Sequence, residues 1–152
     1  MDGTEAQTTG WVHEVVQDGE WAGWSMYGND PFEDHAGPFY YRMGEDGRPV
    51  CAMRPEPKHM NGGGFMHGGA LMTFADYCLF VIARDALKDS RSVTATFNSE
   101  FVGAVPPGCL LECTGEVVKA GRSMVFVRGI MAVEGEPVLS FSAVLKKTAP
   151  RA

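Results

Sequence analysis

The chain has 152 residues, of which 45% are hydrophobic and 21% charged, so length and composition predict one globular domain with a core of its own. A formal net charge of -6 and a pI near 5.1 exclude a general electrostatic attraction to nucleic acid or to an anionic membrane. The polar, acidic start does not resemble a signal peptide and no apolar run reaches about 18 residues, so we expect a cytoplasmic protein.

The first 37 residues are the less regular part of the chain. Residues 1–9 are polar and predict a disordered tail, and the apolar residues that follow recur at helical spacing. This spacing predicts an amphipathic helix from Gly10 to Trp21, which would either pack on the domain or cover a pocket as a lid. The Gly, Asn, Asp and Pro residues between Ser25 and Gly37 predict a loop. We therefore divide the chain into residues 1–37, a tail and a helix, and residues 38–148, the main domain.

Six segments of the main domain have the composition of β-strands. Residues 39–43 and 49–54 flank an Asp-Gly turn, which is a good hairpin signal. The other four segments come late in the chain, are rich in Val, Phe, Thr and Ile, and span residues 92–102, 110–119, 123–133 and 138–147. Short turns separate them, which predicts an antiparallel meander.

One stretch between these two groups of strands organises the rest. Residues 70–83 are apolar on almost every side, which predicts a buried helix that ends near Leu87. Asp76 is an exception, and a carboxylate on a buried helix needs a partner or a function. The sequence therefore predicts an α+β fold. About six antiparallel strands form a sheet wrapped around one long buried helix, with an additional helix near the N-terminus.

The turn before this helix offers hydrogen-bond donors. Gly68 and Gly69 leave the backbone N–H groups of the first helical turn open to a ligand, and Asn61 and His67 add side-chain donors. Such a helix terminus favours an anion or a developing oxyanion. Asp76 lies about 10 Å beyond Gly69 along the helix, too far for one copy to bring both to a reacting carbon. If Asp76 is catalytic, we predict a two-fold dimer in which each subunit lends Asp76 to the other's glycine turn.

This spacing resembles the hotdog-fold acyl-CoA thioesterases, specifically the phenylacetyl-CoA thioesterase-like branch. There an Asn precedes a His-Gly-Gly turn by six positions and an Asp follows the His by nine, as do Asn61, His67 and Asp76. The resemblance implies that a glycine amide, here Gly69, polarises the thioester carbonyl and that Asn61 holds the water or the carbonyl. It also implies that Asp76 of the partner is nucleophile or general base, oriented by Thr94 on the following strand. We assign His67 to positioning the turn through a hydrogen bond.

The implied reaction is hydrolysis of an acyl-CoA thioester to a free carboxylic acid and CoA. No cofactor is expected, because CoA is part of the substrate. The expected partners are the acyl-CoA substrate and further copies of the chain, as a homodimer and a dimer of dimers, with no nucleic acid and no membrane. Basic residues should ring the pocket entrance to bind the CoA phosphates, although solvated surface charge explains each candidate equally well. The candidates are Lys88, Arg91, Lys119 and Arg122.

Two other functions stay open at this point. An acyl-CoA hydratase or dehydratase on the same fold would use a differently placed His, and the run from Asn29 to Pro31 with His35 matches such a pattern only loosely. A non-catalytic acyl-CoA-binding module would be favoured by a missing acid or base, whereas Asp76 is present. No metal site is expected, because the spacing of the histidines does not fit one. The four cysteines are expected to be reduced core thiols: Cys51, Cys78, Cys109 and Cys113.

Overall fold

The computed structural model describes residues 12–150, so the predicted tail over residues 1–9 lies outside the described part. The early elements are β1 (Val12–Val15), β2 (Ser25–Gly28), α1 (Pro31–Ala36), β3 (Tyr40–Met43), β4 (Pro49–Met53) and a 3-10 turn at Pro57–His59. They are followed by α2 (Gly68–Ile82), α3 (Arg84–Leu87), β5 (Ser90–Phe101), β6 (Leu111–Ala120), β7 (Met124–Val133) and β8 (Glu136–Pro150).

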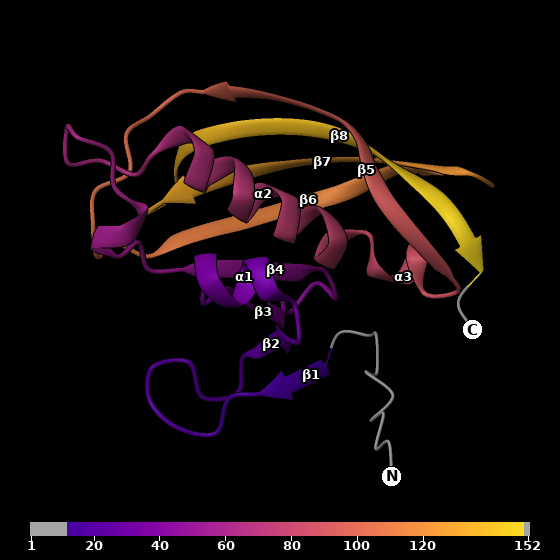
Figure 1. The fold of residues 1–152 in the computed structure, drawn as a ribbon, viewed down its shortest axis with the longest axis horizontal. Coiled ribbons are helices and arrows are strands. Elements are labelled where there is room, and N and C mark those ends of the chain that lie inside the picture. The colour runs from indigo at the N-terminus through magenta and orange to yellow at the C-terminus, as the bar shows by residue number, and fades with distance from the viewer. Residues whose placement is uncertain (1–11, 151–152) are drawn as a thin grey trace, which may run out of the picture.

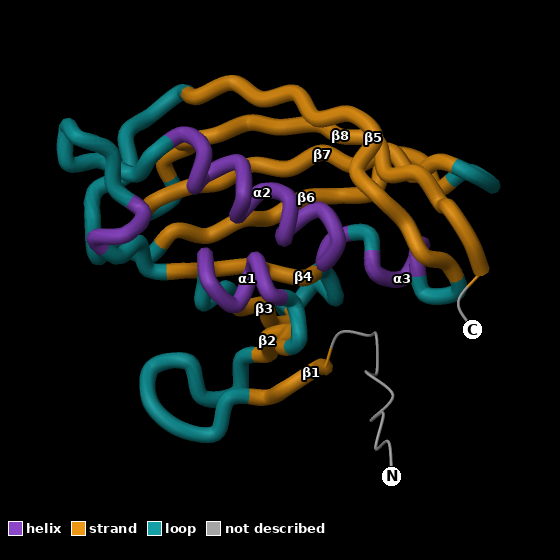
Figure 2. Tube along the Cα trace, viewed as in Figure 1, coloured by secondary structure: helices purple, strands orange, loops and turns teal. Residues whose placement is uncertain are grey.

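One antiparallel sheet curves around α2, as the sequence predicts for an α+β fold (Figures 1 and 2). The strand order is β1-β2-β3-β4-β6-β7-β8-β5, so the described sheet has eight strands where about six were predicted. The Asp-Gly hairpin and all four late strands lie close to their predicted positions along the chain. The predicted meander holds only for β6, β7 and β8, because β5 pairs with β8 and not with β6. None of the helices in the described part has the length and apolar character that crossing a membrane requires.

The N-terminal prediction is wrong within residues 12–21. Instead of a helix, β1 pairs with β2 in a hairpin in which Val12 lies opposite Gly28. Positive φ angles of 81° at Gly19 and 86° at Gly23 allow the connection to turn back. The valines are spaced for a helix, but β-branched residues also favour a strand, and pairing with a neighbouring strand decides between the two.

The predicted loop over residues 25–37 is also wrong, because it contains β2 and the short helix α1. The Asp30 side chain caps α1 by accepting a hydrogen bond of 3.0 Å from the Glu33 N–H, and Pro31 occupies the first helical turn. An Asp cap followed by proline is a start signal for a helix. The additional N-terminal helix therefore exists, but it is α1 and not a helix over residues 10–21.

α2 lies along the concave face of the sheet (Figure 1). Most of its side chains are buried in the core. It approaches the sheet closely at the cross-strand pair Gly115 and Gly129, because a Cβ at Gly115 would clash with Ile82 of the helix. One stripe of the helix stays uncovered. Each member lies three or four residues from another, and all are half-buried or exposed: Gly69, Met72, Thr73, Asp76 and Phe80. The prediction of a helix buried all round is thus correct for every side but this one.

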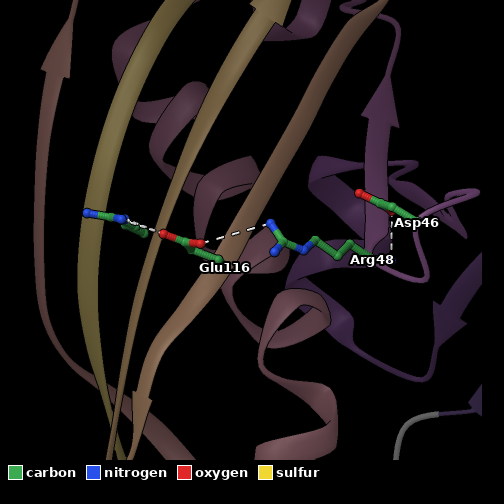
Figure 3. Close-up of polar contacts among 4 residues, drawn as sticks. Asp46, Arg48 and Glu116 are labelled. Atoms are coloured by element: carbon green, nitrogen blue, oxygen red, sulfur yellow. Dashed lines mark hydrogen bonds and ion pairs between the residues drawn. The ribbon is translucent and has the colours of Figure 1, made fainter.

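The outer face of the sheet carries a polar chain of contacts. Glu116 of β6 contacts Arg128 of β7 on one side and, on the other, Arg48 in the turn between β3 and β4. Figure 3 shows Arg48 reaching toward Glu116. The Arg128 Nε donates to Glu116 at 2.7 Å, and the Arg48 N–H donates to the Asp46 carboxylate at 2.9 Å. Four exposed apolar side chains from β6 and β7 accompany them: Val118, Met124, Phe126 and Ile130. The contacts of Glu116 with Arg48 and Arg128 link the hairpin of β3 and β4 to the centre of the sheet.

Candidate active site

Asn61 closes the glycine-rich loop that leads into α2. Its Oδ1 accepts hydrogen bonds from the N–H groups of Gly63, at 2.9 Å, and Phe65, at 3.2 Å. Its backbone N–H donates to the Phe65 carbonyl at 2.7 Å. The side-chain oxygen is thus occupied, whereas the Nδ2 group has no acceptor among residues 12–150. Since the residue is exposed, Asn61 can donate from Nδ2 to a ligand.

His67 is the N-cap of α2 and sets the geometry of the turn. Its Nδ1 accepts a hydrogen bond of 2.8 Å from the Gly69 N–H, and its own N–H donates to the His59 carbonyl at 2.8 Å. A ring nitrogen that accepts carries no proton, so the neutral ring is protonated at Nε2. His67 therefore positions the turn through a hydrogen bond.

The hydrogen bonds at the start of α2 show which amide is free. The Gly69 N–H donates to His67, and the N–H groups of Ala70 and Leu71 donate to the His67 carbonyl at 2.9 and 3.0 Å. Only the Gly68 N–H in this turn has no acceptor among the residues that the structure describes. The sequence singled out Gly69 as the oxyanion donor, but the amide open to a ligand belongs to the preceding glycine.

Among residues 12–150, Asp76 has one hydrogen-bond partner, and it comes from β5. Thr94 Oγ1 on β5 donates to Asp76 Oδ1 at 2.6 Å, the usual length for a hydroxyl that donates to a carboxylate. The Asp76 side chain is half-buried and lies in the uncovered stripe of α2. The second carboxylate oxygen has no partner in the described part of the chain. Asp76 is thus held by one oxygen and can act with the other.

The predicted site residues form two separate groups in one copy of the chain. Gly68 and Asp76 are eight residues apart on α2, which corresponds to about 12 Å. β5 runs antiparallel to α2, because Thr94 lies at Asp76 while the Phe101 ring is 3.3 Å from where a Gly68 Cβ would stand. The glycine turn, Asn61 and His67 are therefore at one end of α2, and the carboxylate with its threonine is near the other.

The four basic candidates gather at one end of the sheet. β5 begins beside the end of β8, where Ser90 pairs with Pro150, and β7 begins there too, where Met124 pairs with Lys146. The candidate residues are exposed and form no ion pair among residues 12–150: Lys88, Arg91, Lys119 and Arg122. They lie at the end of α2 that follows Asp76.

Sequence reasoning missed a cavity between α1 and α2, which Glu33 and Tyr77 both line. Burial, and then the negative charges of Asp30 and Asp76, raise the pKa of the Glu33 carboxyl to about 7. Burial also raises the pKa of the Tyr77 phenol far above its usual range. The Asp30-Pro31 cap could have revealed α1, but nothing in the sequence shows that α1 packs beside α2.

The cysteines and His59 serve the core. Cys51, Cys78 and Cys113 are free and buried, and burial raises the pKa of Cys51 and Cys78. These three are the reduced core thiols that the sequence predicts, whereas Cys109 is only half-buried. His59 accepts from the Glu56 N–H at 2.9 Å through Nδ1 and contacts the Ala36 carbonyl at 2.5 Å through Nε2. Both ring nitrogens are thus used to fasten α1 to the loop before α2.

Comparison with known proteins agrees with this fold. Residues 63–139 match the family described as the Thioesterase superfamily. A Pseudomonas aeruginosa protein, PA0474, which carries the provisional name of an esterase, is 34% identical over 102 residues, covering 66% of this chain and 76% of that protein.

Solved structures share the fold at low sequence identity. A Streptococcus pneumoniae thioesterase protein with coenzyme A has a TM-score of 0.69 at 19% identity, over 80% of this chain and 98% of that one. The Escherichia coli PaaI protein from the phenylacetic acid degradation operon has a TM-score of 0.70 at 19% identity, over 80% and 87% of the two chains. The fold is the hotdog fold, and the class of enzyme is that of thioester hydrolases. The chain belongs to the Thioesterase superfamily.

Proposed function

We propose that this protein hydrolyses acyl-CoA thioesters to a carboxylic acid and CoA at a site that two subunits share. The observation that carries the proposal is the separation of the two chemical groups on α2. The unpaired Gly68 amide and the Asp76–Thr94 pair are about 12 Å apart along the helix axis. A reacting carbonyl must lie about 3 Å from both groups, so a second copy has to bring them together.

The edge strand β5 offers a surface for this second copy. β5 has twelve residues and ends the sheet, so one row of its backbone N–H and C=O groups faces outward without a strand neighbour. Antiparallel pairing of two β5 edges about a two-fold axis near Asn98 would bring Thr94 close to Phe101 of the partner subunit. Because Phe101 lies beside Gly68 and Thr94 holds Asp76, this pairing would bring each carboxylate to the other subunit's glycine turn.

The uncovered stripe of α2 supports the same two-fold arrangement. Met72 is 42% exposed between Gly68 and Asp76, and Phe101 of β5, whose ring lies beside Gly68, is 51% exposed. Large apolar side chains that share one exposed face are typical of an interface. The dimer would cover them with the same residues of a second copy. The apolar side chains on the outer face of the sheet would serve the dimer of dimers that we also propose.

In the proposed reaction the thioester oxygen accepts a hydrogen bond from the Gly68 N–H, while the Asn61 Nδ2 donates to the carbonyl or to the attacking water. The partner's Asp76 either removes a proton from water as the water oxygen attacks the carbonyl carbon, or attacks that carbon itself. In the first route the tetrahedral adduct collapses, the carbon–sulfur bond breaks and the CoA thiolate takes up the proton. In the second, CoA leaves as an acyl-aspartate anhydride forms, and water then hydrolyses the anhydride.

In this proposal, exposed basic side chains bind the CoA phosphates by electrostatic attraction rather than in a formed pocket. The basic end of the sheet, formed by Lys88, Arg91, Lys119 and Arg122, has no internal ion pairs in the described chain and lies near the Asp76 end of α2. The S. pneumoniae structure with coenzyme A shows that this fold can hold the ligand. Exposed charges of this kind are screened by salt, so we expect the KM for an acyl-CoA to rise between low and moderate ionic strength.

A thiol-release assay over short, long and aromatic acyl-CoAs tests the function. Asp76→Asn should lower kcat by at least about 100-fold with much less effect on KM, because the group acts on the transition state. Asp85→Asn is the matched control, since Asp85 is a highly exposed acid on α3. Near-normal turnover by Asp76→Asn would remove Asp76 from the mechanism. Loss of enoyl-CoA absorbance without thiol release would identify a hydratase, and tight binding with neither reaction would identify a binding module.

A further inference from the structure

The loop that leads into α2 is a small β-hairpin whose base is formed by His59 and His67. The His67 N–H donates to the His59 carbonyl at 2.8 Å, and Met60 and Met66 form the next bridge toward the tip. Asn61 lies directly beyond this bridge, and α2 begins directly after His67. The residues that fix the base therefore set the direction in which the loop and the first amide of α2 point.

His59 connects this base to two other parts of the chain. It is the only histidine or charged residue that is buried within residues 12–150, with 5% of its surface exposed. Its Nδ1 accepts from the Glu56 N–H at 2.9 Å, so the neutral ring carries its proton on Nε2 and donates it to the Ala36 carbonyl at the end of α1. Its backbone N–H donates to the Glu56 carbonyl at 2.9 Å. All four polar groups of His59 thus have a partner, and the ring joins α1 to the hairpin.

The direction of the Gly68 amide depends on how His67 is held. The peptide group that carries the Gly68 N–H also contains the His67 carbonyl, which accepts from Ala70 and Leu71 in the first turn of α2. On its other side, His67 is held by its hydrogen bond to His59. The free amide therefore lies between two anchors, α2 and His59. A displacement of about 1 Å at a reaction centre can lower the rate about 100-fold, so the second anchor bears on turnover.

The hairpin has a further attachment that consists of backbone atoms only. The Met66 N–H donates to the Val105 carbonyl at 2.8 Å, and both residues are buried in the core. No side-chain substitution at His59 removes this hydrogen bond. We therefore expect the hairpin to stay attached to the domain when the imidazole is changed, while its base loses the link to α1.

We propose that His59 is a positioning residue for thioester hydrolysis: its imidazole fixes the base of the hairpin, and thereby the direction of the Gly68 N–H toward the oxyanion. This inference rests on the proposed thioesterase function. The ring is buried and acts through the Gly68 amide, which stabilises the transition state, so its loss should lower kcat more than it changes KM. If His59 only stabilised the core, its substitution would lower the Tm and leave the kcat of the folded protein unchanged.

Two variants remove the hydrogen bonds of the ring one at a time. His59→Gln can place a donor where Nε2 stands and keep the bond to Ala36, whereas His59→Asn can place an acceptor where Nδ1 stands and keep the bond to Glu56. Only the bond to Ala36 links the hairpin to α1. We expect kcat to fall about 10- to 100-fold in His59→Asn and less than about fivefold in His59→Gln, with KM within about threefold of the native value in both.

The matched control is His35→Gln, because His35 is a histidine on α1 whose side chain is exposed. This variant should keep the native kcat. Thiol release is measured on the acyl-CoA that the native protein hydrolyses fastest. Thermal unfolding of each variant confirms that the protein is folded at the assay temperature.

A double-mutant cycle separates positioning of the amide from general damage to the site. If His59 acts through the Gly68 amide, His59→Asn should lower kcat less than about threefold in a Gly68→Pro protein, which lacks that N–H. In a Thr94→Val protein, where the amide is intact, the same change should cost about 10- to 100-fold. No difference between the two His59 variants, or equal losses in the two backgrounds, would overturn the inference. A native protein that releases no thiol from any acyl-CoA would overturn the proposed function as well, which distinguishes the two failures.

Discussion

Replacing Gly68 with proline removes one backbone N–H from the proposed reaction centre and leaves the helix in place. Gly68 is the first residue of α2, where a missing N–H breaks no helical hydrogen bond. The preceding His67 has φ −62° and ψ 136°, within the extended region that a residue before proline prefers. The change is therefore a test of one donor rather than of the fold.

The expected size of the effect follows from the role of this donor. Loss of a single oxyanion donor lowers kcat by about 10² to 10³-fold, or about 2.7 to 4 kcal/mol. Stability should change little. Proline restricts the unfolded chain by about 0.4 to 1 kcal/mol, and the added Cβ would approach the Phe101 ring at 3.3 Å, which a small shift of that ring can relieve.

The assay compares Gly68→Pro with Gly68→Ala by thiol release and by thermal unfolding. Alanine adds the same Cβ but keeps the N–H, so its kcat should stay within about tenfold of the native value, well above that of the proline variant. Similar turnover by Gly68→Pro and the native protein would refute the assignment to Gly68. The role would then return to Gly69, whose N–H would have to leave His67 before it could bind the oxyanion.

Three further predictions concern the groups around this centre. Thr94→Val removes the 2.6 Å hydrogen bond to Asp76 and should lower kcat about 10- to 100-fold. Thr94→Ser keeps the hydroxyl and should retain most of the native kcat. Equal kcat values in the two variants would show that this hydrogen bond has no role in the reaction. The pKa of the Glu33 carboxyl is raised from 4.5 to about 7 in the folded state. The folded protein therefore binds this proton more tightly than the unfolded chain does, and the stability that the bound proton contributes is lost as the pH rises from about 4.5 through 7. Glu33→Gln should therefore be more stable than the native chain at pH 8 by about 1 to 2 kcal/mol, a figure reduced to allow for the partial exposure of the carboxyl. At pH 4 the variant should gain no stability. Urea unfolding at both pH values measures the difference, and an equal gain at both would contradict the prediction. Met72→Glu would place like charges near the two-fold axis and should give an inactive monomer in size-exclusion chromatography. The control Met43→Glu, at a position on β3 with the same 42% exposure, should stay dimeric. A dimeric Met72→Glu variant would count against the α2 interface.

The elements that the sequence predicts well are those in which a local pattern and the tertiary structure agree. α2 is apolar over four turns, and eight of its 15 residues are buried. The late strands carry long runs of β-forming residues, and the turn at Gly47 has the positive φ that its Asp-Gly signal implies. The segment over residues 12–21 was misassigned because its valines fit both a helix and a strand. Only pairing with β2, which is a long-range contact, decides between them.

The site residues also fall into those that a local pattern predicts and those that depend on long-range contacts. Spacing alone places Asn61 and His67 in the turn and Asp76 on the helix, because a helix converts sequence separation into distance. Spacing does not show which glycine amide is free, since that depends on the direction of the His67 ring. Glu33 was missed because its environment comes from the packing of α1 against α2, and no local pattern records that contact.

A heterodimer built from two inactive subunits tests the shared site most directly. One subunit carries Asp76→Asn and the other Gly68→Pro, and two different affinity tags allow the mixed dimer to be purified after co-expression. If each centre takes its carboxylate from one subunit and its amide from the other, the mixed dimer contains one intact centre and one doubly damaged centre. It should then have about half the kcat of the native dimer, although both parent homodimers are nearly inactive. A mixed dimer as inactive as its parents would show that each centre lies within one subunit.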